Sequence, residues 1–154
     1  MRSLFLSSGI GLLLLCPHSA ASQQMDPALM GVWKLDVAQS TFGGGPSPAG
    51  GQVNWTEHGW VFVLQAGDGS LYADGAVTDH GGCILIGVSN RFSCQVKVLS
   101  PRHVRLWLYE GAALRRLGDI ELVDSNTTRT VHHVTPGDGP PYVETTIWHR
   151  DSPN

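Results

Sequence analysis

Alternation of apolar and polar side chains, with a period of two, runs through most of this chain. In one segment Val104, Leu106 and Leu108 alternate with Arg105 and Trp107. Successive side chains of a β-strand point to opposite faces of a sheet, so this period is typical of strands with one buried face. The chain is therefore predicted to be all-β.

Turn-forming residues interrupt the alternation at short intervals, as in Gly67-Asp68-Gly69 and Ser100-Pro101-Arg102. The segments between the turns predict about ten strands, near residues 31–36, 51–57, 60–66, 70–77, 83–88, 93–99, 103–110, 113–123, 128–135 and 141–150. Hairpin-length connections favour an antiparallel up-and-down β-barrel of about 8–10 strands, with a β-sandwich as the alternative. Before the first strand, Asp26-Pro27-Ala28-Leu29-Met30 predicts one short helical turn, because proline is favoured at the first helical position.

The N-terminus has the order of a secretory signal peptide. Arg2 supplies the positive start, an apolar stretch runs from Leu4 to Leu15, and Ala20-Ala21-Ser22 offers small residues for cleavage. The apolar stretch is shorter than the roughly 20 residues that a membrane-spanning helix needs. We expect a cleaved signal peptide at 1–22, one domain at 23–154, and a secreted or periplasmic protein without a membrane anchor.

Cysteine usage agrees with export. Cleavage removes Cys16 and leaves Cys83 and Cys94 in a compartment where thiols tend to be oxidised. The residues between them have the pattern of a strand, a Ser89-Asn90 turn and a returning strand, which would bring the two cysteines opposite one another. A structural disulfide is the expectation, and a pair of free buried thiols is the alternative.

Charge and motifs exclude several classes of partner. The chain has 10 basic and 13 acidic side chains, a formal net charge of −3, so neither nucleic acid nor an anionic membrane surface is expected to bind it. It has no Gly-x-Ser-x-Gly, Gly-x-Gly-x-x-Gly or phosphate-loop motif, and its histidines lack local metal-ligand spacing. No metal or cofactor is expected, and the oligomeric state is left open.

The start of the first predicted strand resembles that of a known group. Gly31-Val32-Trp33-Lys34-Leu35-Asp36 is similar to the Gly-x-Trp-Lys-Leu opening of lipocalins and intracellular fatty-acid-binding proteins, the calycins. This resemblance implies a closed barrel with the tryptophan at one end, packed against a basic side chain from a late strand. Arg150 is expected to stack on Trp33, with Arg129 as the alternative.

A wider likeness, to exported bacterial proteins of unknown function, includes the same opening, Gly45-Pro46-Ser47-Pro48 and a last strand that ends in arginine. It implies no activity. The chain departs from fatty-acid-binding proteins in its last strand, where Thr146-Ile147-Trp148 replaces their Arg-x-Tyr, and in the Gly/Pro stretch, which leaves no room for their helical lid. A fatty-acid carrier is not supported specifically.

Aromatic residues are the first candidates for function. Five tryptophans and three tyrosines could line an apolar cavity with a few polar groups, which suits an aromatic or other apolar ligand. The candidate ligand-binding residues are Trp55, Trp60, Arg105, Trp107, Tyr109, Tyr142 and Glu144. Arg105, Trp107 and Tyr109 share one face of a strand, and the sequence leaves open whether that face points inward.

Histidines beside carboxylates are the second candidates, since such pairs can transfer protons. Glu57-His58 and Asp79-His80 lie at turns, and in His132-His133 only one ring can enter a barrel because neighbours face opposite ways. The catalytic candidates are His58, Asp79, His80, His133 and Tyr109, the last as an anion holder.

The leading hypothesis is an exported, lipocalin-like barrel that binds a small molecule. The alternatives are a cofactor-independent lyase, isomerase or hydrolase with a His/carboxylate site in the barrel, and a structural or interaction domain with a filled core. Whether the chain is an enzyme is left open at this point. An inward histidine within hydrogen-bonding reach of a carboxylate would favour the enzyme.

Overall fold

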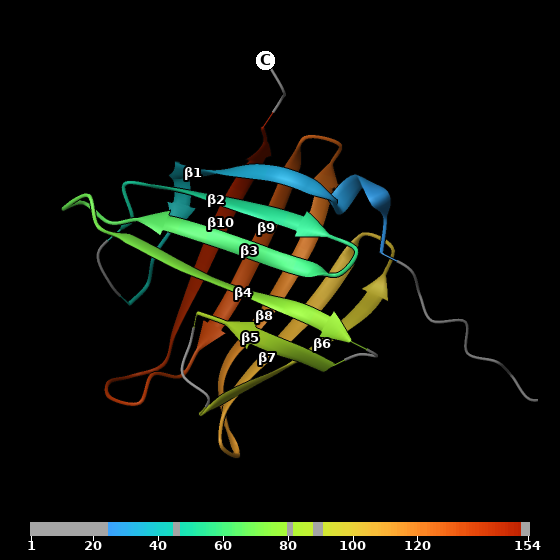
Figure 1. The fold of residues 1–154 in the computed structure, drawn as a ribbon. Coiled ribbons are helices and arrows are strands. Elements are labelled where there is room, and N and C mark those ends of the chain that lie inside the picture. The colour runs from blue at the N-terminus through green and yellow to red at the C-terminus, as the bar shows by residue number, and fades with distance from the viewer. Residues whose placement is uncertain (1–24, 45–46, 80–81, 88–90, 152–154) are drawn as a thin grey trace, which may run out of the picture.

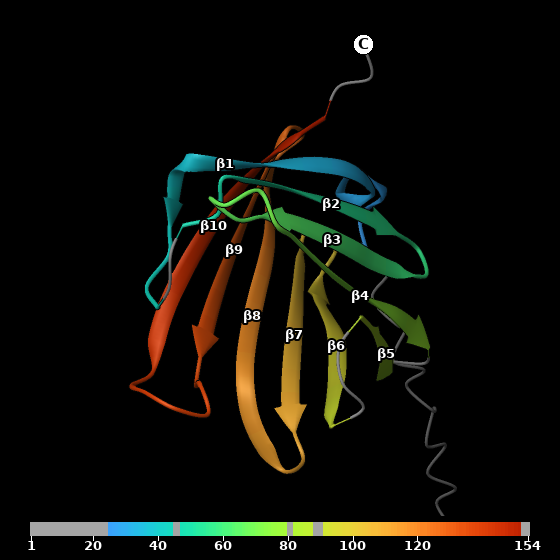
Figure 2. The same ribbon diagram turned by 60° about the vertical axis from the view of Figure 1, so that its left-hand side comes forward.

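The fold is a closed barrel of ten antiparallel strands, seen in a computed structural model that describes residues 25–44, 47–79, 82–87 and 91–151 (Figure 1). Each strand pairs with its neighbours in sequence, and β1 closes the barrel by pairing with β10. The prediction of an antiparallel up-and-down barrel is confirmed. Figure 2 shows that β1, β2 and β3 cross β7, β8 and β9 at a steep angle.

The strand bounds are close to the predicted ones. The elements are η1 (Pro27–Leu29), β1 (Gly31–Thr41), β2 (Gly50–Thr56), β3 (Gly59–Gln65), β4 (Leu71–Asp79), β5 (Gly82–Ile86), β6 (Phe92–Ser100), β7 (His103–Glu110), β8 (Ala113–Asp124), β9 (Thr127–Val134) and β10 (Tyr142–Arg150). Only β1 is markedly longer than predicted. Its pairing with β10 is irregular between Asp36 and Thr41, where the Ser40 hydroxyl donates to the Asp36 carbonyl, so the strand bends instead of ending.

The predicted helical turn is present as the 3-10 turn η1, which covers one end of the barrel. Asp26 caps it by accepting a hydrogen bond from the Ala28 amide at 2.8 Å. The side chain of Leu29 is almost fully buried, and its carbonyl accepts a hydrogen bond from Trp33 Nε1 at 3.0 Å. This end is therefore closed by packing.

The expected stacking of an arginine on Trp33 is confirmed for Arg150. Its guanidinium carbon lies 4.2 Å from the centre of the Trp33 ring. The same guanidinium donates to the carbonyls of Met30, Ala28 and Ser125. Arg150 thus joins the last strand to η1 and to the turn after β8.

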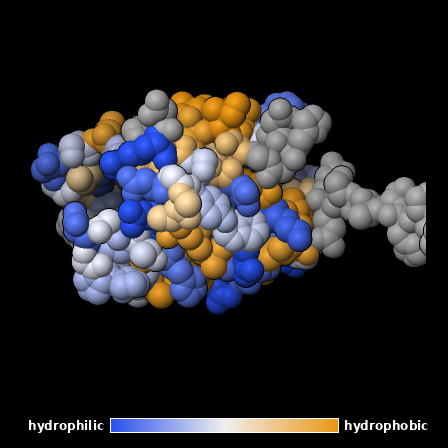
Figure 3. Space-filling model, turned by 90° about the horizontal axis from the view of Figure 1, so that it is seen from below, coloured by the Kyte–Doolittle hydropathy of each residue, from blue (hydrophilic) through white to orange (hydrophobic). Residues whose placement is uncertain are grey.

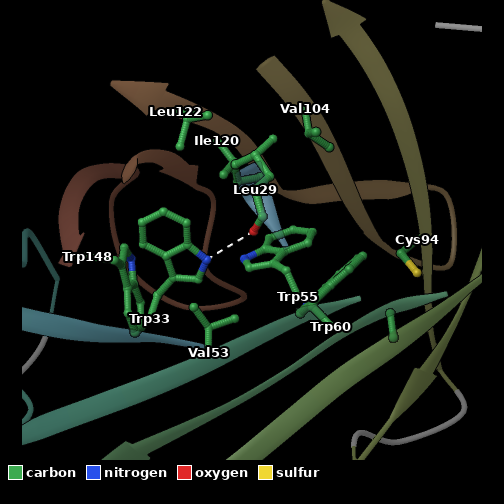
Figure 4. Packing of buried hydrophobic residues seen from close by; sticks show 11 residues of the cluster. Leu29, Trp33, Val53, Trp55, Trp60, Cys94, Val104, Ile120, Leu122 and Trp148 are labelled. Atoms are coloured by element: carbon green, nitrogen blue, oxygen red, sulfur yellow. Dashed lines mark hydrogen bonds between the residues drawn. The ribbon is translucent and has the colours of Figure 1, made fainter. Parts of the chain in front are cut away.

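Buried apolar side chains fill the barrel near η1. Figure 4 shows them converging from several strands, with Leu29 between Trp33 and Trp55. The members are Leu29, Trp33, Val53, Trp55, Trp60, Ala76, Cys94, Val104, Ile120, Leu122 and Trp148. Burial of this many large apolar groups is the main source of stability in a barrel of this size.

Cys83 and Cys94 form a disulfide, as the sequence predicted, with their Cα atoms 5.4 Å apart. They face one another across the β5–β6 pair. Within the described residues this is the shortest ladder of the barrel, with only Gly82↔Gln95 beside the cysteine pair, whereas five residue pairs join β4 to β5. The bridge therefore covalently joins the two neighbouring strands that have the fewest paired residues among those described.

The predicted signal peptide, residues 1–22, lies outside the described residues, so its cleavage stays a prediction. In the described ranges, no helix has the length and hydropathy to cross a membrane.

Candidate functional site

A cavity of about 460 Å³ lies inside the barrel. Its mouth is formed by Phe42, Ser47 and Pro48 from the segment between β1 and β2, together with Ala66 and Gly67 at the β3–β4 turn. This volume is within the range of small-molecule sites, roughly 300–1,000 Å³. A second hollow, of about 400 Å³, lies beside η1 and is lined by Met25, Pro27 and Met30 together with the other side of Trp55 and Trp60.

One wall of the cavity is aromatic. Trp55 on β2 and Trp60 on β3 lie side by side (Figure 4), with ring centres 5.1 Å apart and planes tilted by 33°. Phe62 and Tyr72 continue the wall toward the mouth, with ring centres 5.8 Å apart. The four aromatic side chains that line this wall offer a broad apolar surface to a planar molecule.

A polar group lies on another part of the wall, formed by β8, β9 and β10. His132 on β9 is paired with Gly118 on β8 at one side and with Glu144 on β10 at the other. The Nδ1 atom of His132 lies 3.0 Å from Oε1 of Glu144. An Arg116 guanidinium nitrogen lies 3.6 Å from the same Glu144 oxygen. We refer to Arg116, His132 and Glu144 as the polar cluster.

Gly118 makes room for the imidazole of His132. A Cβ atom at Gly118 would lie 2.7 Å from Cδ2 and 2.9 Å from Nε2 of His132. Such distances are shorter than non-bonded contacts allow, so any other residue would displace the ring. A glycine inside a strand often marks such a close approach.

The electrostatics of the polar cluster favour a neutral histidine beside an ionised glutamate. Burial is the largest cause that lowers the pKa of His132, and the charge of Arg116 lowers it further, against the opposing effect of Glu144. Burial alone would raise the pKa of Glu144, but the hydrogen bond from His132 and the charge of Arg116 outweigh it and lower this pKa. Because an ionised carboxylate can only accept, Nδ1 of His132 carries the hydrogen and donates it.

A second carboxyl group faces the cavity from β4. Asp74 accepts a hydrogen bond from the Tyr72 hydroxyl at 3.1 Å, and both residues line the cavity. Burial raises the pKa of Asp74, although the Tyr72 hydrogen bond and the Arg116 charge oppose the rise. Burial, followed by the Asp74 charge, also raises the pKa of Tyr72.

Two groups of the polar cluster have unused hydrogen-bonding capacity. Among the described residues, neither the Arg116 guanidinium nor Nε2 of His132 has a hydrogen-bond partner. In this part of the chain, every fully buried side-chain nitrogen or oxygen has a hydrogen-bond partner. Because these two groups have none, they are not fully buried, and they are accessible from the cavity that both residues line. A bound molecule can therefore accept from Arg116 and donate to His132.

Of the candidate ligand-binding residues, Trp55, Trp60, Tyr142 and Glu144 line the cavity. Arg105, Trp107 and Tyr109 do not, because they alternate with Leu106 and Leu108, which face the interior. Arg105 instead forms an ion pair with Asp119 on the outer face, at 2.8 Å. The face that the sequence left open is thus the outer one, and Tyr109 does not line the cavity.

His58 and His133, two of the candidate catalytic residues, also lie outside the cavity. His58 is exposed at the β2–β3 turn and pairs with Glu57 at 3.2 Å. His133 is exposed on β9, and the histidine that enters the barrel is His132. Asp79 is the last residue of β4, and His80 lies outside the described residues.

The outer surface mixes charged and apolar side chains. Exposed apolar residues on β3, β4 and β5 include Val61, Val77, Ile84 and Ile86. Figure 3 shows apolar residues beside hydrophilic ones on the side of the barrel seen from below.

Sequence reasoning missed Arg116 and Asp74, and its catalytic candidates included His133 and not His132, which is the one that lines the cavity. Gly118 was an available signal, because its place within the strand 113–123 marks a close approach from a neighbouring strand. No group of three metal-binding side chains is present in the part of the chain that the structure describes. A scan against models of protein families, a search of curated proteins and a search of solved structures each return no match to this chain.

Proposed function

We propose that this chain is an exported β-barrel that binds a small, neutral aromatic molecule carrying a carbonyl group. The observation that carries the proposal is the cavity of about 460 Å³, with an aromatic wall and, in its lining, Arg116, whose guanidinium has no hydrogen-bond acceptor among the described residues. The aromatic wall binds the ring system by apolar and stacking contacts. Arg116 donates to the carbonyl oxygen.

A neutral ligand is favoured over an anionic one by the charges around the cavity. Arg116 already has the Glu144 carboxylate at 3.6 Å, and Asp74 lines the same cavity. A ligand carboxylate would be repelled by both acidic groups in a site of low dielectric constant. A carbonyl oxygen accepts from Arg116 without adding a charge.

The open cavity also counts against the alternative of a structural domain with a filled core. Apolar surface left unfilled inside a barrel loses packing contacts, which lowers stability. The polar cluster adds a further cost, since its charges are partly removed from water. Both costs are consistent with a site kept for binding.

Tryptophan fluorescence tests the binding proposal, because Trp55 and Trp60 form part of the cavity wall. Acetylnaphthalene, naphthoate and ethylnaphthalene form a matched set of ketone, carboxylate and hydrocarbon. We expect saturable quenching with the ketone, weaker binding of the hydrocarbon and the weakest binding of the carboxylate. Arg116→Gln should weaken ketone binding by about tenfold and leave hydrocarbon binding unchanged.

The outer residue Arg105 provides the matched control, since Arg105→Gln removes an arginine that does not line the cavity. A flat fluorescence response to all three compounds would refute the proposed function. Equal binding of the three would refute the role of Arg116.

Export is tested by the intact mass of the protein recovered outside the cytoplasm. The expected mass lacks residues 1–22 and is reduced by the two hydrogens of one disulfide. A chain that retains its N-terminus would contradict export by signal-peptide cleavage.

A further inference from the structure

We propose that His132 is a catalytic base, and that the barrel isomerises its ligand by moving a proton from the carbon next to the carbonyl group. Glu144 positions the imidazole, and Arg116 holds the carbonyl oxygen. This inference rests on the proposed function, because it assigns a reaction to the same cavity and the same class of ligand.

The hydrogen-bonding state of His132 is the first support. Its Nδ1 hydrogen is donated to Glu144 Oε1 at 3.0 Å, so a neutral ring has its lone pair on Nε2. Nε2 has no partner among the described residues and is accessible from the cavity. A histidine held by a carboxylate at one nitrogen and open at the other is arranged for general-base catalysis.

The position of Arg116 is the second support. His132 Nδ1 and an Arg116 guanidinium nitrogen lie 3.0 Å and 3.6 Å from the same oxygen of Glu144. The two side chains are therefore neighbours on one part of the wall. A carbonyl oxygen that accepts from Arg116 brings its adjacent carbon to the side of the cavity where Nε2 is accessible.

The surroundings keep the base active and the cavity suited to a carbanion-like intermediate. Burial, with the Arg116 charge as a smaller cause, lowers the pKa of His132, so the ring stays neutral and ready to accept a proton at neutral pH. The guanidinium stabilises negative charge that develops on the carbonyl oxygen, and this is more effective in an apolar cavity than in water. The ionised Glu144 stabilises the imidazolium that forms.

The reaction balances without any co-reactant. The bond between the carbon next to the carbonyl and its hydrogen breaks, its electron pair enters the enolate, and the proton bonds to His132 Nε2. In a β,γ-unsaturated ketone the enolate is conjugated with the double bond, so the same proton can return to the far carbon. The product is the conjugated ketone, and the histidine is neutral again.

Two assays on the full chain test the inference. The first measures loss of hydrogen from the methyl ketone group of acetylnaphthalene in heavy water by mass spectrometry. The second follows conversion of allyl phenyl ketone to propenyl phenyl ketone by its ultraviolet absorbance. We expect both reactions to exceed the buffer rate, and His132→Gln to slow both by about 100-fold or more.

The control for His132→Gln is His133→Gln, which changes the exposed neighbour on the same strand and should leave both rates unchanged. Ketone binding, measured by fluorescence, shows whether each variant is folded with its cavity intact. The dissociation constant of the ketone should change less than about twofold in His132→Gln. Wild-type binding without exchange or isomerisation overturns this inference and leaves the proposed function standing. Absence of binding overturns the proposed function itself.

The dependence of the isomerisation rate on pH tests the role of Glu144 as a positioning residue. The charged and titratable groups around His132 are Glu144 on β10, Arg116 and Asp119 on β8, and Asp74 with Tyr72 across the cavity on β4. Removing the negative charge in Glu144→Gln lowers the pKa of His132 further, so the pH at half-maximal rate should move to a lower value. An unchanged midpoint would contradict the positioning role.

Discussion

The imidazole of His132 occupies the space that a side chain on Gly118 would need. A Cβ atom there would lie 2.7 Å from His132 Cδ2, and the ring cannot withdraw freely because Nδ1 is bonded to Glu144. The two residues are direct partners across the β8–β9 pair. Gly118 therefore determines whether His132 can face the cavity in this orientation.

Gly118→Ala should lower the free energy of unfolding by about 1–3 kcal/mol, the usual cost of overpacking. Denaturation in urea measures this change. Gly118→Ala combined with His132→Ala should recover most of the loss, because the displaced ring is then absent. Gly67→Ala is the control, since nothing lies within 4 Å of a Cβ at that position; an equal loss there would contradict the steric explanation.

Arg150→Lys should lower the free energy of unfolding by about 2–3 kcal/mol, because lysine keeps the charge but loses the planar group that stacks and donates several hydrogen bonds. Arg150 contacts the Trp33 ring and the carbonyls of Met30, Ala28 and Ser125. Thermal unfolding provides the measurement. Arg129→Lys, at an arginine paired with Glu121 and half-exposed, should cost less than about 1 kcal/mol. A larger loss of stability in Arg129→Lys than in Arg150→Lys would contradict the assignment of Arg150 as the arginine that holds this end of the barrel together.

Replacing both cysteines, in Cys83→Ala with Cys94→Ala, should lower the free energy of unfolding by about 3 kcal/mol, because a short loop is no longer closed in the unfolded chain. The sequence separation of the bridge is 11 residues. Urea denaturation of the variant and of the reduced wild-type chain should give similar values. A variant as stable as the oxidised wild type would show that the bridge adds nothing to the short β5–β6 ladder.

Acid should destabilise the fold through His132. Its pKa in the folded chain is lowered from the ordinary value of 6.5, chiefly by burial, so the unfolded chain takes up the proton more readily. The stability that depends on the neutral ring is thus present above pH 6.5 and is lost as the pH falls below this value toward the folded pKa. Urea unfolding as a function of pH should show the decline.

His132→Gln should flatten this decline, whereas His133→Gln should not. The comparison between variants is needed because the lowered pKa of Glu144 acts in the same direction at lower pH, while the raised pKa of Asp74 acts in the opposite direction. Identical pH profiles for wild type and His132→Gln would contradict the buried neutral histidine.

Most of the fold could be predicted from the sequence, because alternation and turn residues are local signals. The register between strands is not local. Beyond Asp36 the alternation of β1 is interrupted by an irregular pairing, and no residue in that segment reveals that the strand continues. The stacking of Arg150 on Trp33 was accessible only through the resemblance to calycins.

The site was harder to predict because alternation separates two faces without saying which is inside. Arg105 and Trp107 share one face of β7, while Leu106 and Leu108 share the other. Large aromatic groups favour the first face as the interior, yet the leucines face the cavity. Arg116 gave no signal either, since a charged residue on a strand is typical of an outer surface.

The aromatic wall lies on β2, β3 and β4, and the polar cluster on β8, β9 and β10, and no strand of one set is paired with a strand of the other. Substitutions in one set therefore leave the backbone pairing of the other intact. Selection, in nature or in the laboratory, can reshape which ring systems the barrel admits while the groups that meet the carbonyl stay as they are.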